Sequence, residues 1–239
     1  MGRLACSIEN GVALIRLDDG KANAIEAGWC AELEAALDQI EGAGDARAAV
    51  LFGRPGCFCA GLDRKRLPAL SMQDLGATTR AFVALMERVF LFPKPVVAAS
   101  AGHALAGGLM LYLAADLRIA VDDASPRYGL PEVTQGIPVI GPTAAICAAG
   151  IPSAHHAELL LHGRRLSARE AFERAVVHEL AADVGALEGR ALERARELCG
   201  LDRAAYRATK RALRRPLLDA ARAAAATVAA DLPKGNPFR

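Results

Sequence analysis

A run of apolar, β-prone residues that stops at a glycine and continues as an apolar helix constrains the fold more than any other feature. Residues 96–101 predict a strand, Gly102 ends it, and residues 107–115 predict a helix. Gly107 and Gly108 stand at the start of that helix, where small residues let a ligand approach the backbone. The free N–H groups of a helix N-terminus favour negative charge there, although tight packing of a helix on a strand selects the same small residues.

Two further stretches carry a pattern that is specific in combination. Residues 57–63, Cys-Phe-Cys-Ala-Gly-Leu-Asp, follow the apolar run 48–52. Residues 128–133, Tyr-Gly-Leu-Pro-Glu-Val, precede Gly-Ile-Pro at 136–138. In this order and spacing, the three stretches resemble the crotonase (enoyl-CoA hydratase/isomerase) superfamily, and the resemblance runs from Leu14 to about Asp183.

Strands that alternate with helices favour an α/β fold with parallel crossovers. Asn10-Gly11 between two alternating runs predicts a hairpin. The resemblance implies a spiral of ββα turns with two roughly perpendicular sheets. We therefore expect a crotonase-like core over residues 1–185. Further predicted elements are helices over residues 27–41 and around 82–90, and strands over residues 47–52 and 117–121.

The C-terminal segment, residues 186–239, is rich in Ala and Arg and is predicted to be helical. Two helices are expected, over residues 188–198 and 203–230, with a break or kink at Pro216. A helical tail of this composition buries little area alone, so it should pack on the core or on a neighbouring subunit. The resemblance implies a homotrimer, or a hexamer made of two trimers.

Composition excludes several classes of protein. The formal net charge is +2 with Lys and Arg spread along the chain, which does not indicate a nucleic-acid surface. No apolar run reaches the ~18 residues that span a bilayer, and no signal-peptide pattern opens the chain. Six cysteines without a C-x-x-C pair are interpreted as small, buried or half-buried thiols, and no metal is expected. A cytoplasmic protein is the expectation.

The resemblance implies a reaction on a coenzyme A thioester. Loss of a proton beside the thioester carbonyl produces an enolate, whose oxygen is stabilised by two backbone N–H donors. By match to the family pattern, the donors are the amides of Ala60 and Gly107. No cofactor is expected, because coenzyme A is part of the substrate. The resemblance also implies a role in fatty acid metabolism.

Glu132 matches the position where the family places a catalytic acid/base. Hydratases of the family carry a second Glu three residues after the oxyanion glycine, and here that position is Met110. A methionine can neither accept a proton nor orient water, whereas one carboxylate is enough to move a proton between two carbons. The sequence therefore favours an enoyl-CoA isomerase, with an enoyl-CoA hydratase (a lyase) as the alternative.

Substrate-binding residues are also carried over by match. The loop at Lys21 and Ala22 and the segment after Asp63 are placed near the nucleotide of coenzyme A. Arg64, with Lys65 and Arg66, could offer charge to its phosphates, although such a run is also typical of a solvated surface. Asp63 is equally suited to fixing a turn. The complete predicted set of substrate contacts is Lys21, Ala22, Cys59, Gly61, Asp63, Arg64 and Met110.

Other classes are weaker. Residues 102–107 have the spacing of a phosphate-binding loop, but Gly108-Leu109 replaces Lys-Ser/Thr. Ser100, His103 and Asp116 suggest a serine hydrolase, yet the G-x-S-x-G pattern is missing. Other thioester chemistry on the same fold, such as a thioesterase, and a non-catalytic acyl-CoA binder stay open as alternatives.

Overall fold

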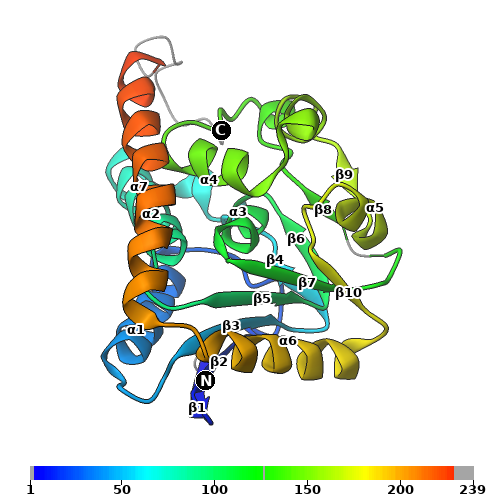
Figure 1. The fold of residues 1–239 in the computed structure, drawn as a ribbon. Helices are drawn as coiled ribbons and strands as arrows, with labels where there is room; N and C mark the ends of the chain where they lie inside the picture. Colours follow the sequence, from blue (N-terminus) through cyan, green and yellow to red (C-terminus); the bar gives the residue numbers. More distant parts are fainter. Residues whose placement is uncertain (1–2, 126, 229–239) are drawn as a thin grey trace.

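Two β-sheets form the centre of the molecule (Figure 1). The computed structural model describes residues 3–125 and 127–228. Neighbouring strands are parallel except in the pairs β1–β2 and β8–β9. The larger sheet has the order β1 (Leu4–Glu9), β2 (Val12–Leu17), β3 (Ala48–Gly53), β5 (Val96–Ser100), β7 (Leu117–Val121), β10 (Glu179–Ala181). The smaller sheet has the order β4 (Gly56–Cys59), β6 (Gly102–Leu105), β8 (Tyr128–Gly129), β9 (Arg165–Leu166).

Helices cover both faces of the larger sheet. In Figure 1, α6 runs along one face of this sheet, while α3 and the smaller sheet lie on the other. The α/β fold predicted from the sequence is confirmed. The helices are α1 (Ala27–Gly42), α2 (Met72–Phe90), α3 (Gly107–Ala114), α4 (Pro142–Gly150), α5 (Ala168–Glu173), α6 (Val184–Cys199) and α7 (Arg203–Val228), with short helical turns at Leu67–Ala69, Val133–Gln135, Ser153–His155 and Ala157–Leu161.

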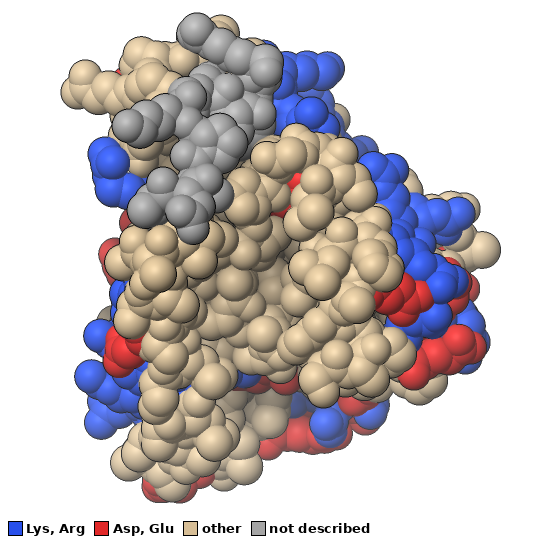
Figure 2. Space-filling view, turned by 90° about the horizontal axis from the view of Figure 1, so that it is seen from above, with Lys and Arg blue, Asp and Glu red and all other residues tan. Residues whose placement is uncertain are grey.

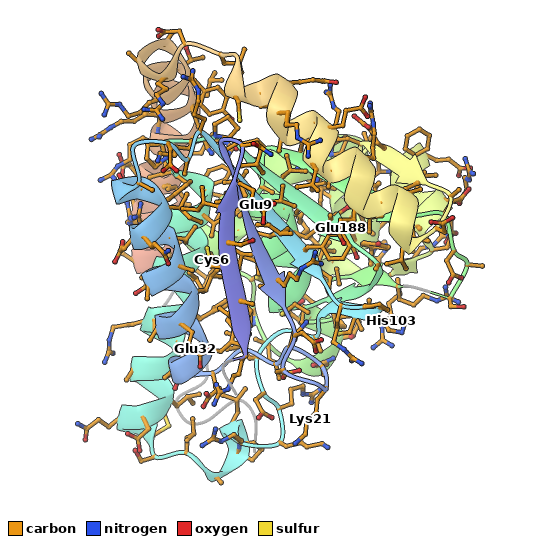
Figure 3. The ribbon with its side chains drawn as sticks, turned by 90° about the horizontal axis from the view of Figure 1, so that it is seen from below. Cys6, Glu9, Lys21, Glu32, His103 and Glu188 are labelled. Atoms are coloured by element: carbon orange, nitrogen blue, oxygen red, sulfur yellow. The ribbon has the colours of Figure 1, made fainter. Side chains whose placement is uncertain are left out.

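The predicted hairpin is present at the start of the chain. Strands β1 and β2 pair antiparallel, with Glu9 opposite Val12. Asn10 and Gly11 both have positive φ, 52° and 82°, as a two-residue hairpin turn requires. Figure 3 shows this ribbon from below, with Cys6 and Glu9 on β1 and Glu188 on α6.

Alternating side chains of the central strands enter two separate cores. In β3, Ala49 and Leu51 pack in the large core under α1, α2 and α3. Val50 and Phe52 pack on the opposite face. Because both faces are covered, the strand is a continuous apolar run rather than an alternating one. The second core includes three residues of α6, namely Leu187, Ala191 and Ala195.

The C-terminal helix α7 is joined to the core by an ionic cluster of the buried Lys210 with the half-buried Asp116 and Arg214. Lys210 Nζ lies 2.8 Å from Asp116 Oδ2, and Arg214 Nη1 lies 2.9 Å from Asp116 Oδ1. Asp116 Oδ2 also accepts a hydrogen bond from the amide of Val96, the first residue of β5. Leu218 is the apolar anchor of the same helix face. Thus α7 packs on its own core, one of the two placements expected from the sequence.

Several local predictions need correction. The helix expected around residues 82–90 begins at Met72, capped by Ser71. Helix α7 continues through Pro216 without a break. Residues 229–230, which the sequence also assigned to this helix, lie outside the described residues. The four short strands of the smaller sheet were not predicted.

The cysteines agree with their interpretation as buried or half-buried thiols. Cys30, Cys57, Cys59 and Cys147 are buried, and Cys6 and Cys199 are half-buried. Across residues 3–125 and 127–228, His, Cys, Asp and Glu form no cluster of three that could hold a metal ion. None of the helices described is both long and apolar enough to cross a membrane.

Candidate active site

The two glycine-containing turns of the sequence meet at one end of the smaller sheet. Strands β4 and β6 are parallel neighbours, with Cys59 opposite Ala104, so the turns that follow them emerge side by side. A Cβ atom on Gly61 would lie 2.8 Å from the amide nitrogen of Gly107. Gly61 has φ +85°, a conformation that favours glycine. The topology therefore positions the backbone at Gly61 against the N-terminus of α3.

The prediction that Ala60 supplies a free amide is wrong. The N–H of Ala60 donates to the carbonyl of Ala22 at 3.0 Å, and three residues later the N–H of Asp63 donates to the carbonyl of Ile25 at 3.0 Å. Between them, the Leu62 amide has no acceptor among the described residues. The amide of Gly107, at the start of α3, likewise has none there. The pair of free donors beside each other is thus Leu62 and Gly107.

Asn23 holds the loop that occupies the Ala60 amide, a role that sequence reasoning missed. Its buried side-chain amide donates to the carbonyls of Leu17 at 2.8 Å and Phe58 at 3.0 Å. Its Oδ1 accepts from the Asp19 amide at 2.9 Å. Asn23 also has φ 48°, which asparagine tolerates better than most residues. The local signal was an Asn in a turn, but its partners lie far away in sequence.

A cavity of about 460 Å³ opens over the two free amides. Its floor includes Leu62, Gly107 and Met110. One wall is the face of α2, and the other is the segment from Gln135 to Thr143, between β8 and α4. Figure 2 shows a hollow on the upper face of the molecule, bordered mainly by side chains other than Lys, Arg, Asp and Glu. The apolar residues of the walls are Met72, Leu75, Phe82, Val83, Ile137, Pro138, Val139 and Ile140.

Glu132 reaches this cavity from the turn after β8. It is 7% exposed, and its Oε2 atom has no hydrogen-bond partner among the described residues. Burial raises the pKa of the Glu132 carboxyl from 4.5 to about 7, and its own backbone N–H offsets this slightly. The turn is fixed because the Glu132 carbonyl accepts from the amides of Gln135 and Ile137, both at 2.9 Å. A carboxyl group with a pKa near neutrality suits proton transfer.

Met110 also faces the cavity, as expected for the position three residues after Gly107. It lies in α3 and is 4% exposed. Of the described residues that line the cavity, Glu132 is the one with a carboxylate, and Arg64 is the one with a positive charge. No second carboxylate from the described part of the chain faces Glu132 across the cavity.

The remaining predicted contacts do not line the cavity. Cys59 is fully buried, and its thiol donates to the carbonyl of Asn23 at 3.0 Å, so it cannot touch a substrate. Gly61 is buried against α3. The carboxylate of Asp63 accepts a hydrogen bond from the Lys65 amide at 3.1 Å. Asp63 therefore fixes this turn, which was the alternative to substrate binding. Lys21 and Ala22 lie on the loop after β2, and Figure 3 shows Lys21 at the margin of the molecule.

The basic run after Asp63 is only partly available for a ligand. The Arg66 guanidinium donates to Glu26 at 2.6 Å, so its charge is partly neutralised. Arg64 and Lys65 are exposed, and Arg64 stands on the cavity wall. Of the three basic residues, Arg64 therefore has the position that best fits an anionic ligand.

The serine hydrolase alternative is excluded by geometry. The Ser100 hydroxyl is buried, donates to the carbonyl of Gly102 at 2.7 Å and accepts from Tyr128 at 3.0 Å. His103 accepts from the Arg127 amide, and Asp116 pairs with Lys210. The three side chains thus have separate partners and do not form a triad.

Two free amides and a buried carboxylate that line one apolar cavity are suited to stabilising an enolate oxygen while a proton moves. A family model described as enoyl-CoA hydratase/isomerase matches residues 7–234. The chain belongs to the enoyl-CoA hydratase/isomerase family, and it is an enzyme of the crotonase fold. It is 33% identical over 200 residues to a Bacillus subtilis protein named "probable enoyl-CoA hydratase", covering 83% of this chain and 75% of that protein.

Solved structures agree with this assignment. The chain is similar to the Mycobacterium tuberculosis protein EchA3, named a probable enoyl-CoA hydratase, with a TM-score of 0.88 and 29% identity over 96% of both chains. A second structure of this same M. tuberculosis protein, which is named as an enoyl-CoA isomerase, matches with a TM-score of 0.86 and 29% identity, over 96% of this chain and 99% of that chain. The predicted family is confirmed, while the reaction differs between the names of the relatives.

Proposed function

We propose that the protein is an enoyl-CoA isomerase that moves a double bond along an acyl-CoA thioester. The observation that carries this proposal is the pairing of Glu132 with Met110 in one cavity. Addition of water needs a second group to hold and activate the water molecule, and a thioether cannot do so. A double-bond shift needs only one group that accepts a proton and returns it.

In the proposed reaction, the thioester oxygen accepts hydrogen bonds from the amides of Leu62 and Gly107. The ionised Glu132 removes a proton from the carbon next to the thioester carbonyl of a 3-enoyl-CoA. The electrons of that C–H bond form a dienolate, whose oxygen is stabilised by the two amides. The protonated Glu132 then returns its proton to the fourth carbon, which gives the 2-enoyl-CoA. The unpartnered Oε2 atom of Glu132 supports this role.

Hydration of a 2-enoyl-CoA is the second candidate, because relatives such as the B. subtilis protein are named as hydratases. With Glu132 as its one cavity-lining carboxylate among the described residues, the enzyme would have to activate water and deliver the proton with the same group. We therefore expect hydration to be slow.

The test is the isomerisation of 3-hexenoyl-CoA by the wild type and by Glu132→Gln. Glutamine keeps the shape of the side chain and removes the base, so the rate should fall about 100- to 10,000-fold. Gln135→Glu, on the same turn and the same cavity wall, is added to Glu132→Gln in a double variant, which tests whether any carboxylate in the cavity suffices. Unchanged turnover by Glu132→Gln would contradict the assignment of the base.

We also propose that the protein works in the cytoplasm as a homotrimer or a hexamer, with no cofactor besides the coenzyme A of its substrate. The outer face of α7 supports self-association, because Leu213 is 68% and Leu217 44% exposed. The variant carrying Leu213→Glu and Leu217→Glu should have a lower mass by light scattering. Leu201→Glu, equally exposed at 43% but outside α7, is the control. The same mass for all three proteins would contradict an interface on α7.

A further inference from the structure

A glycine stands inside the helix that forms one wall of the cavity. Gly76 lies in the first half of α2 and lines the cavity together with Leu75 and Thr79. A glycine inside a helix lowers its stability relative to alanine. A residue of this kind in an otherwise regular helix needs a reason in its surroundings.

Neither the backbone nor the packing requires glycine at this position. Gly76 is absent from the residues with positive φ, so its conformation is open to any residue. A Cβ atom there would approach one atom within 4 Å among the described residues, the Nη1 of Arg80 at 3.2 Å, at the end of a flexible side chain. What a larger side chain at residue 76 would fill is the cavity itself.

The position of Gly76 along α2 relates it to the length of a bound acyl group. At the end of the cavity where the free amides lie, the Phe82 ring contacts Gly107, since a Cβ on Gly107 would lie 2.9 Å from the ring. Gly76 comes six residues earlier, about 9 Å along the helix axis at a rise of 1.5 Å per residue. With at most about 1.5 Å per carbon–carbon bond, a four-carbon acyl group ends well before Gly76, and a ten-carbon group can reach it.

We propose that Gly76 is the specificity-determining residue that admits long apolar acyl chains, so that acyl-CoA thioesters with aliphatic chains of about eight carbons or more bind more tightly than shorter ones. This inference rests on the proposed function, since it takes the thioester to lie at Leu62 and Gly107. The wall around Gly76 supports an apolar chain, because Met72, Leu75 and Val83 belong to the same face of α2.

The test is calorimetric binding of the saturated thioesters butyryl-CoA and decanoyl-CoA, which need no turnover. The wild type should prefer decanoyl-CoA, and Gly76→Leu should reduce that preference at least about 10-fold, the lower end of what one methylene is worth in an apolar pocket. Gly76→Ala should reduce it less and should raise the melting temperature, since alanine favours the helix. This milder variant keeps the test decisive if Gly76→Leu folds poorly.

Gly189→Leu is the matched control. Gly189 is an exposed glycine inside α6, with no atom of the described residues within 4 Å of an added Cβ and no place in the cavity wall, so this variant should keep the chain-length preference. An unchanged preference in both Gly76 variants would overturn the role of Gly76 and leave the proposed function standing. Failure of the wild type to bind either thioester would overturn the proposed function as well.

Discussion

Gly61 and Gly107 approach so closely that a Cβ atom on Gly61 would lie 2.8 Å from the Gly107 amide nitrogen. One glycine belongs to the turn after β4, and the other begins α3. Because the two segments touch through backbone atoms, the position of one fixes the position of the other. The free amides of Leu62 and Gly107 are held together by this contact.

Gly61→Ala should disrupt both the fold and the site. The new Cβ would collide with the Gly107 amide, and the residue would keep an unfavourable φ of +85°. Turnover should fall at least about 100-fold, in line with the loss of an oxyanion donor. Gly20→Ala is the control, since its φ is +72° but its added Cβ has no described atom within 4 Å. Equal losses of melting temperature and turnover in the two variants would contradict the importance of the contact.

A pair of substitutions at Gly107 isolates its N–H group. Alanine and proline both add a Cβ beside the Phe82 ring, but only proline removes the N–H, and proline is tolerated at the first position of a helix. The kcat of Gly107→Pro should be about 100- to 1,000-fold below that of Gly107→Ala. Circular dichroism verifies that both fold. The same kcat for the two variants would exclude this amide as a donor.

Burial of Glu132 should make stability depend on pH. Its pKa is raised from 4.5 to about 7 in the folded protein, so the folded state binds this proton more tightly than the unfolded state does. The contribution of Glu132 to the free energy of unfolding therefore falls as the pH rises from 4.5 through 7. At pH 8, Glu132→Gln should be more stable than the wild type by up to about 3 kcal/mol.

Urea denaturation of the wild type and of Glu132→Gln, at pH 5 and at pH 8, measures this effect. The stability difference should be small at pH 5 and large at pH 8. The same difference at both values would show that the Glu132 carboxyl has an ordinary pKa.

The ionic cluster at α7 gives a further prediction. Lys210 is 6% exposed, and Asp116 is its described carboxylate partner. Asp116→Asn leaves a buried positive charge without compensation, which should lower the free energy of unfolding by about 3–5 kcal/mol. Asp219→Asn is the control, because Asp219 pairs with Arg215 and Arg222 on the surface and should cost at most about 1 kcal/mol. Denaturant titration distinguishes the two, and similar losses would contradict a structural role for the cluster.

Much of the larger sheet could be predicted from the sequence, because its signals are local. Asn10-Gly11 specifies a turn with positive φ at both residues, and the apolar runs at 48–52 and 96–101 are long enough to indicate buried strands. The smaller sheet could not be predicted in the same way. Strands β8 and β9 are two residues long, which is too short for any periodicity to appear.

The free donor of the site was misassigned for a related reason. The loop at residues 22–25 decides which amide after β4 stays free, because its carbonyls accept hydrogen bonds from the amides of Ala60 and Asp63. That pairing joins segments almost 40 residues apart. The position of Glu132, by contrast, follows from a local turn, and the structure places it on the cavity as the motif indicated.

The central claim is that one carboxylate, Glu132, moves a proton between two carbons and that hydration is slow because Met110 offers no second group. The most direct measurement compares the wild type on 3-hexenoyl-CoA and on 2-hexenoyl-CoA, by the rate of 2-enoyl-CoA formation in the first case and of 3-hydroxyacyl-CoA formation in the second. We predict turnover at ordinary enzyme rates, about 10 per second, for isomerisation, and hydration at least about 100-fold slower. Hydration at about 10 per second or faster would contradict the account.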